Sequence, residues 1–150
     1  MLKRRMLALV SLAALLVLSA CTPAAQRSGP LEMRLTEAGP PGGASVVPPA
    51  GLEWLRCSLD ITNTSETTQT VDYQAGQLAL FDGHKAVPAR GGTGSTAEDA
   101  GHKMIFSRVP ALPGGGAVAV YRNFLVTPDQ RNLTLVYRLP GYPDHTWKVR

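Results

Sequence analysis

One stretch of this sequence constrains the fold more than any other. Residues 53–63 (EWLRCSLDITN) alternate apolar side chains with mostly polar ones, and the apolar set is Leu55, Cys57, Leu59 and Ile61. Residues two apart point to the same side of a β-strand. The alternation therefore predicts a strand that buries one face in a core and turns the other outward.

Further stretches of the chain carry the same signal in shorter or weaker form. They lie at residues 31–37, 70–73, 78–80, 103–109, 117–126, 132–139 and 145–149. The 15 glycines and 12 prolines are common in the segments between them, where they favour turns. The pattern predicts an all-β chain of about seven or eight short strands, with an antiparallel β-sandwich as its architecture. It predicts no helix beyond residue 20.

Three local features refine this prediction. Asp82-Gly83 is a dipeptide that favours a two-residue hairpin turn. Residues 89–101 show no apolar pattern, so we expect the longest exposed loop there. Arg122 falls in phase with the apolar residues of its strand, and a β-bulge near Arg122-Asn123 would resolve that conflict.

The N-terminus has the layout of a secretory signal peptide. A basic start is followed by an apolar run too short to span a membrane comfortably, then by Leu18, Ser19, Ala20 and Cys21. With a cysteine directly after Leu-Ser-Ala, residues 1–20 resemble the bacterial lipoprotein signal with its lipobox. The resemblance implies cleavage before Cys21 and a diacylglycerol on its sulfur. An ordinary signal peptide with an incidental cysteine, or an uncleaved anchor, are the alternatives.

The same assignment sets the domain boundaries. Residues 21–30 are small, polar and proline-containing, which predicts a flexible tether. Residues 31–150 then form the β-sandwich. With Cys21 lipidated, Cys57 has no partner for a disulfide, and its phase in the strand at 53–63 predicts a small buried hydrophobic residue. A reactive thiol is the alternative.

The charge of the chain excludes one class of partner. The formal net charge is +4, from 15 basic and 11 acidic residues, and three of the bases lie in the signal. The mature chain is therefore close to neutral. Because it also lacks a basic cluster with interleaved aromatic residues, we expect no nucleic-acid binding.

The chain also resembles a known family. It is similar to the small immunoglobulin-like domain of unknown function that is common in bacterial lipoproteins and secreted proteins. The segments that carry the likeness are 51–63, 77–83 (QLALFDG), 112–114 (LPG), 124–128 and 133–137 (LTLVY). The resemblance implies an antiparallel sandwich and implies no catalytic residues.

The residue types that carry chemistry are sparse. The pair His102 and Met104 has the spacing of one strand face, and a soft His/Met pair suits Cu(I). A loop histidine beside a core methionine is the ordinary interpretation, so metal binding is only the weak alternative. The chain has no Gly-x-Ser-x-Gly motif and no phosphate-binding loop that leads into a helix.

Two aromatic residues are weak candidates for binding a partner. They are Trp54, on the polar face of its strand, and Trp147, in the last predicted strand, and packing within the sandwich is the alternative for both. Asn63 and Asn132 each begin an Asn-x-Ser/Thr pattern, which we interpret as chance.

These observations predict a protein of the cell envelope, attached to a membrane by lipid on Cys21. If the cell has an outer membrane, its periplasmic face is the expected site. We expect an interaction or scaffold module, with an envelope protein as its partner, no cofactor and no enzymatic activity. The alternative is a periplasmic protein that binds a small ligand or copper through His102 and Met104.

Overall fold

The computed structural model describes residues 24–42, 47–72, 76–99, 102–104 and 111–150. This part of the chain forms β-strands joined by turns and loops. Their bounds are β1 Gln26–Ser28, β2 Leu31–Gly39, β3 Glu53–Asn63, β4 Gln69–Thr70, β5 Gln77–Asp82, β6 Lys85–Ala86, β7 Ala89–Asp99, β8 His102–Met104, β9 Ala111–Leu112, β10 Ala117–Val126, β11 Leu133–Arg138 and β12 His145–Lys148. Within these ranges there is no helix long and apolar enough to cross a membrane.

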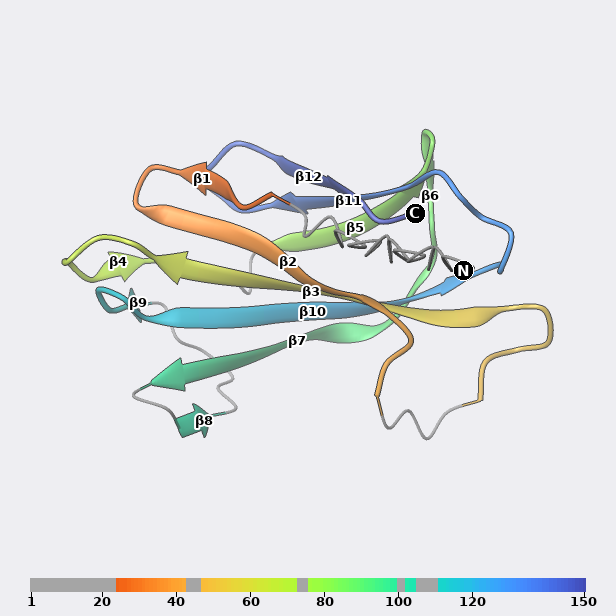
Figure 1. Cartoon of the computed structure of the whole chain (residues 1–150), viewed down its shortest axis with the longest axis horizontal. Helices are drawn as coiled ribbons and strands as arrows, with labels where there is room; N and C mark the ends of the chain where they lie inside the picture. Colours follow the sequence, from red (N-terminus) through yellow and green to blue (C-terminus); the bar gives the residue numbers. More distant parts are fainter. Residues whose placement is uncertain (1–23, 43–46, 73–75, 100–101, 105–110) are drawn as a thin grey trace, which may run out of the picture.

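The strands form two main sheets and one short ribbon. The larger sheet has the order β1-β2-β3-β10-β7-β8, the smaller sheet has the order β12-β11-β5-β6, and β4 pairs with β9. Every pairing is antiparallel. In Figure 1, β2, β3, β10 and β7 run along the long axis of the molecule, and β12, β11 and β5 form a second group of strands. The sets β2-β3-β10-β7 and β5-β11-β12 match the strand order of the constant-type immunoglobulin sandwich, which confirms the predicted fold class.

The strand at 53–63 is the centre of the larger sheet, as the sequence predicts. It pairs with β2 on one side and with β10 on the other. The side chains of Leu55, Cys57, Leu59 and Ile61 are all fully buried. From the facing sheet, Leu78, Leu80, Leu133, Leu135 and Tyr137 complete one continuous core.

The prediction of a loop at residues 89–101 is wrong for residues 89–99, and residues 100 and 101 lie outside the described residues. Residues 89–99 form β7, which pairs with β10 along most of its length. The segment is rich in Gly, Ala, Ser and Thr, so it carries no hydrophobic alternation. Main-chain N–H and C=O groups pair across a sheet whatever the side chain is, and that pairing leaves no mark in the apolar pattern.

The predicted irregularity near Arg122 exists, but the extra residues lie on the neighbouring strand. The register of β10 against β7 shifts between Tyr121 and Asn123, which pair with Gly94 and Arg90. Against β3 the register of β10 is unbroken, with Arg122 opposite Cys57. Arg122 therefore keeps its inward phase and is not redirected as the sequence suggested. It is accommodated because its Nη1 donates a hydrogen bond of 3.0 Å to the carbonyl of Leu78 in the facing sheet.

Two smaller predictions are corrected as well. The turn between β5 and β6 is one residue later than expected, because Asp82 pairs with Lys85 and leaves Gly83 and His84 in the turn. Gly83 has a φ of 58°, a conformation that glycine adopts without strain. The second half of the predicted tether is ordered, since Gln26–Ser28 form β1 and pair with β2.

Candidate functional site

The residues proposed from the sequence lie in different parts of the fold. Cys21 lies outside the described residues, so its lipidation stays a prediction. His102 and Met104 are the two ends of β8, paired through the backbone with Asp99 and Ala97. Among the side chains that the structure describes, no three His, Cys, Asp or Glu residues converge on a metal position. Copper binding stays a prediction.

The two tryptophans have different surroundings. Trp147 is only 4% exposed and belongs to the core, with its ring centroid 6.0 Å from that of His145. A partner cannot reach that ring in the folded domain, so the partner-binding interpretation is wrong for Trp147. Trp54 is half-buried and pairs in register with Leu125. On the same face of the sheet, the Arg56 guanidinium lies 4.8 Å from the centroid of the Tyr121 ring.

Cys57 is an inert core residue. Its side chain is fully buried, and it has no disulfide partner in the described part of the chain. The pKa of the thiol is raised to about 12, chiefly by burial and to a smaller degree by the Glu37 carboxylate, with a still smaller opposing effect of Arg150. Because the thiolate is the nucleophile and the metal ligand, Cys57 is unsuited to both roles near neutral pH.

The larger of two described hollows lies where the chain crosses from the smaller to the larger sheet. It has a volume of about 380 Å³ and is partly open to solvent. We call it the end pocket. Its apolar walls come from Leu52, Val87, Pro88 and Leu125. A second hollow of about 330 Å³, lined by residues 138–142 and Gln77, is more open to solvent.

The polar residues of the end pocket come from the β5–β6 hairpin, the start of β7 and the end of β10. Gln130 fixes one side, because its Nε2 donates to Asp82 Oδ2 at 3.0 Å and its Oε1 accepts from the backbone N–H of Thr127 at 2.9 Å. Lys85 and Arg90 also line the pocket, and both are exposed. Neither forms an ion pair with another described residue. The pocket therefore combines apolar walls with two cations available to a ligand.

At the opposite edge of the fold, β1 joins the two sheets. The side chain of Gln26 donates from Nε2 to the backbone carbonyl of Thr146, and its Oε1 accepts from His145 Nδ1 at 3.1 Å. Since β1 is the edge of the larger sheet and β12 the edge of the smaller one, these bonds close one side of the sandwich. His145 is 5% exposed, and burial lowers its pKa, with a smaller opposing effect of Asp144.

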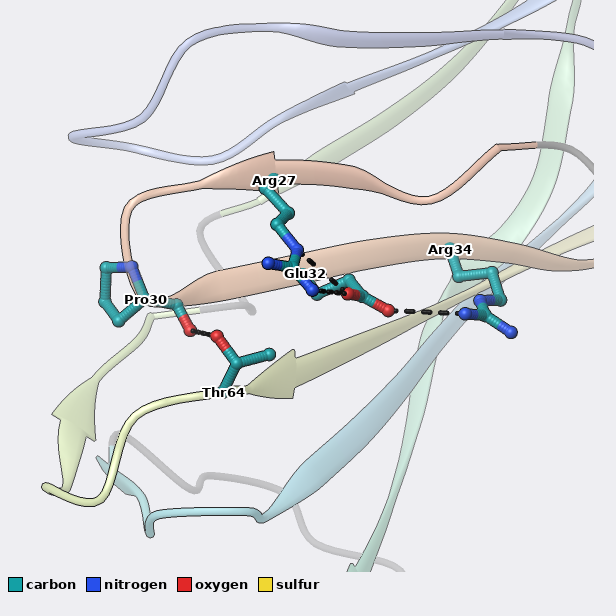
Figure 2. A network of polar contacts seen from close by, with 5 residues as sticks. All are labelled: Arg27, Pro30, Glu32, Arg34 and Thr64. Carbon is teal, nitrogen blue, oxygen red and sulfur yellow. Dashed lines mark hydrogen bonds and ion pairs between the residues drawn. The ribbon is translucent and has the colours of Figure 1, made fainter.

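Figure 2 shows the contacts that hold β1 on β2 and the turn after β1 on the end of β3. Glu32 accepts from Arg27 at 3.1 Å and from Arg34 at 3.3 Å. The Arg27 side chain is 73% exposed, so this ion pair contributes only about 0–1 kcal/mol to stability. The carbonyl of Pro30 accepts from both the hydroxyl and the backbone N–H of Thr64. The start of the domain is thus fixed at several points.

Sequence reasoning missed the role of Asn63. Its side chain is fully buried, which is incompatible with the glycosylation pattern it begins. Its Nδ2 donates to the carbonyls of Thr67 at 2.7 Å and Leu112 at 2.9 Å, and its Oδ1 accepts from the N–H and the hydroxyl of Ser65. An asparagine that ends a strand and is followed by Thr-Ser was the available signal, because such residues cap turns.

Comparison with known proteins identifies a fold and no family. No protein-family model and no curated protein matches the chain. A conserved hypothetical protein from Bacillus anthracis aligns with a TM-score of 0.50 at 8% identity, over 82% of this chain and 91% of that one. An uncharacterized β-sandwich protein from Clostridium difficile gives 0.46 at 12% identity, over 85% and 90%. A candidate lipoprotein, ycdA of Bacillus subtilis, gives 0.49 at 14% identity, over 84% of this chain and 37% of that one. These likenesses are at the level of the β-sandwich fold.

Proposed function

We propose that this protein is a lipid-anchored, non-enzymatic interaction module of the cell envelope, which meets its partner at the end pocket. The observation that carries the proposal is that the chain enters the domain at a distance from the end pocket. The chain enters the domain at β1, whereas the pocket is lined by residues of β6, the start of β7 and the end of β10, and by Leu52, which precedes β3. β6 is the far edge of the smaller sheet, and β2 and β3 separate β1 from β10 and β7 in the larger sheet. A domain attached at Cys21 would present the pocket away from the membrane.

The anchoring half of the proposal is tested on the mature protein from cells. Mass spectrometry of the N-terminal peptide is expected to find Cys21 as the first residue, with the mass of a diacylglycerol on its sulfur. An unmodified Cys21, or cleavage at another position, would refute the anchor.

The interaction half is tested by photocrosslinking in intact cells. A photoreactive amino acid at Arg90, in the pocket, is expected to capture an envelope protein, and the captured band should weaken when Lys85 is changed to Glu. The matched control is the same amino acid at Arg34, an exposed arginine on β2. Equal capture from both positions would contradict the assignment of the partner to the pocket.

The volume of the pocket favours a second candidate, a carrier of a small ligand. About 380 Å³ is within the range of small-molecule sites. The cations Lys85 and Arg90 favour a ligand with an anionic head group. The apolar walls of the pocket, from Leu52, Val87 and Leu125, favour a ligand with an apolar body. Calorimetry with a short-chain carboxylate such as octanoate tests this function. Because a hydrogen bond to a charged group contributes about 1.5–3 kcal/mol, Arg90→Ala should weaken binding by about ten-fold or more. No binding to the wild-type chain would exclude the carrier function for this ligand class.

A further inference from the structure

The edge formed by β1 and β12 is close in sequence to the predicted anchor. Ala24 and Ala25 are the only described residues before β1, and Cys21 lies five residues before Gln26. A fully extended chain covers about 3.6 Å per residue, so Gln26 can be at most about 18 Å from Cys21. A flexible chain of the same length averages about 12 Å.

β1 is bonded to both sheets, so the β1–β12 edge stays close to the point where the chain enters the domain. Three residue pairs with β2 hold β1 on the larger sheet. The hydrogen bonds of the Gln26 side chain with Thr146 and His145 hold it on the smaller sheet. Figure 1 shows β1 and β12 along one long edge of the molecule, while β7 and β8 lie along the other. The lipid would therefore pull on a rigid edge and not on a mobile tail.

The exposed side chains of this edge suit a lipid headgroup surface. Arg27 on β1 is 73% exposed although it pairs with Glu32, and Thr146 and Lys148 on β12 are exposed. Trp147 and His145 point into the core, so no apolar side chain of β12 is offered to the hydrocarbon. A polar, cationic edge lies on the headgroups and does not enter the bilayer.

From this placement we infer that the domain lies on its membrane with the β1–β12 edge against the headgroups and with the far edges of the two sheets, β8 and β6, outward. This inference rests on the proposed anchor at Cys21. It replaces a freely rotating domain on a tether by one fixed orientation, in which Arg27 and Lys148 contact lipid phosphates.

Two lysines of the smaller sheet provide a matched pair of probes. Lys148 on β12 and Lys85 on β6 are both exposed and lie at opposite edges of the order β12-β11-β5-β6. Lys148→Cys and Lys85→Cys are each labelled with the same fluorophore in the full mature lipoprotein. Cys21 is blocked by lipid and Cys57 is buried, so the new thiol takes the label. The proteins are reconstituted into phosphatidylethanolamine/phosphatidylglycerol vesicles that carry a headgroup nitroxide quencher.

The expected result is stronger quenching at position 148. Three strand spacings of about 4.8 Å separate the two probes by about 14 Å, so we expect at least about two-fold more quenching at 148 than at 85. Ten Gly/Ser residues inserted between Pro23 and Ala24 should abolish the difference, because the longer linker averages about 21 Å and lets the domain turn. Equal quenching at the two positions in the natural-length protein, or stronger quenching at 85, would overturn the inferred orientation.

The same experiment distinguishes a missing lipid anchor at Cys21 from a wrong orientation of the domain. If Cys21 is not lipidated, the protein does not float with the vesicles, and the mass of its N-terminal peptide shows no added lipid. A protein that floats with lipidated Cys21 but shows equal quenching at the two probes contradicts the orientation alone.

Discussion

Replacing Asn63 by alanine should be among the most destabilising single changes in this domain. The change removes two donated hydrogen bonds, to the carbonyls of Thr67 and Leu112, and two that the amide oxygen accepts from Ser65. Because Leu112 is 5% exposed, water has little access to the carbonyl left behind. A lost hydrogen bond costs about 1 kcal/mol net, and a buried group left unpaired costs about 1–3 kcal/mol. We therefore expect a loss of about 2–4 kcal/mol in the free energy of unfolding.

The assay is urea unfolding of the mature chain carrying Cys21→Ser, followed by tryptophan fluorescence. With a slope of about 1.5 kcal/mol per molar urea, a loss of 3 kcal/mol lowers the midpoint by about 2 M. Asn132→Ala is the matched control, because Asn132 is exposed, and it should change stability by no more than about 0.5 kcal/mol. Asn63→Asp keeps the acceptor but loses both donors, so it should be as harmful as alanine. An Asn63→Ala midpoint equal to that of Asn132→Ala would refute the reasoning.

Three further predictions address the interior. Gly114→Ala should lower the free energy of unfolding by about 1–3 kcal/mol, because the added Cβ would lie 2.6 Å from the carbonyl oxygen of Glu66. Gly42→Ala is the control and should be neutral, because a Cβ there would have no neighbour within 4 Å; the urea midpoints of the two variants are compared. Burial lowers the pKa of His145 from its usual 6.5, so the unfolded chain takes up the proton first and stability should fall as the pH drops through about 6.5. His145→Phe should reduce the difference between urea midpoints at about pH 8 and about pH 5, and an unchanged difference would contradict the assignment. Cys57 should react with a thiol reagent such as DTNB only after unfolding, because burial raises its pKa to about 12; rapid reaction in the native protein would contradict its burial.

A feature of the candidate sites could be predicted from the sequence where it depends on neighbouring residues of one strand, and could not where it depends on contacts between strands. The sequence predicted a buried Cys57 correctly, because its phase within the strand at 53–63 is a local property. It treated Trp54 and Trp147 alike, although Trp147 is in the core and Trp54 is half-buried. Trp147 is buried because its side of β12 faces the larger sheet, and that placement is known only once the two sheets have packed. The end pocket had no sequence signal at all, since it forms only where β6, β7 and β10 meet.

The order of apolar and polar residues is enough to predict the all-β class, the central strand Glu53–Asn63 and the faces of the core strands, because alternation with a period of two assigns each side chain to one face. Three features emerge only in the folded domain: residues 89–99 form a strand, Arg122 stays inward opposite Cys57, and β1 closes the sandwich against β12. Those features depend on main-chain pairing and on contacts between residues far apart in the chain. Main-chain hydrogen bonds do not depend on side-chain hydrophobicity, and the carbonyl of Leu78 reaches Arg122 only after the two sheets have packed.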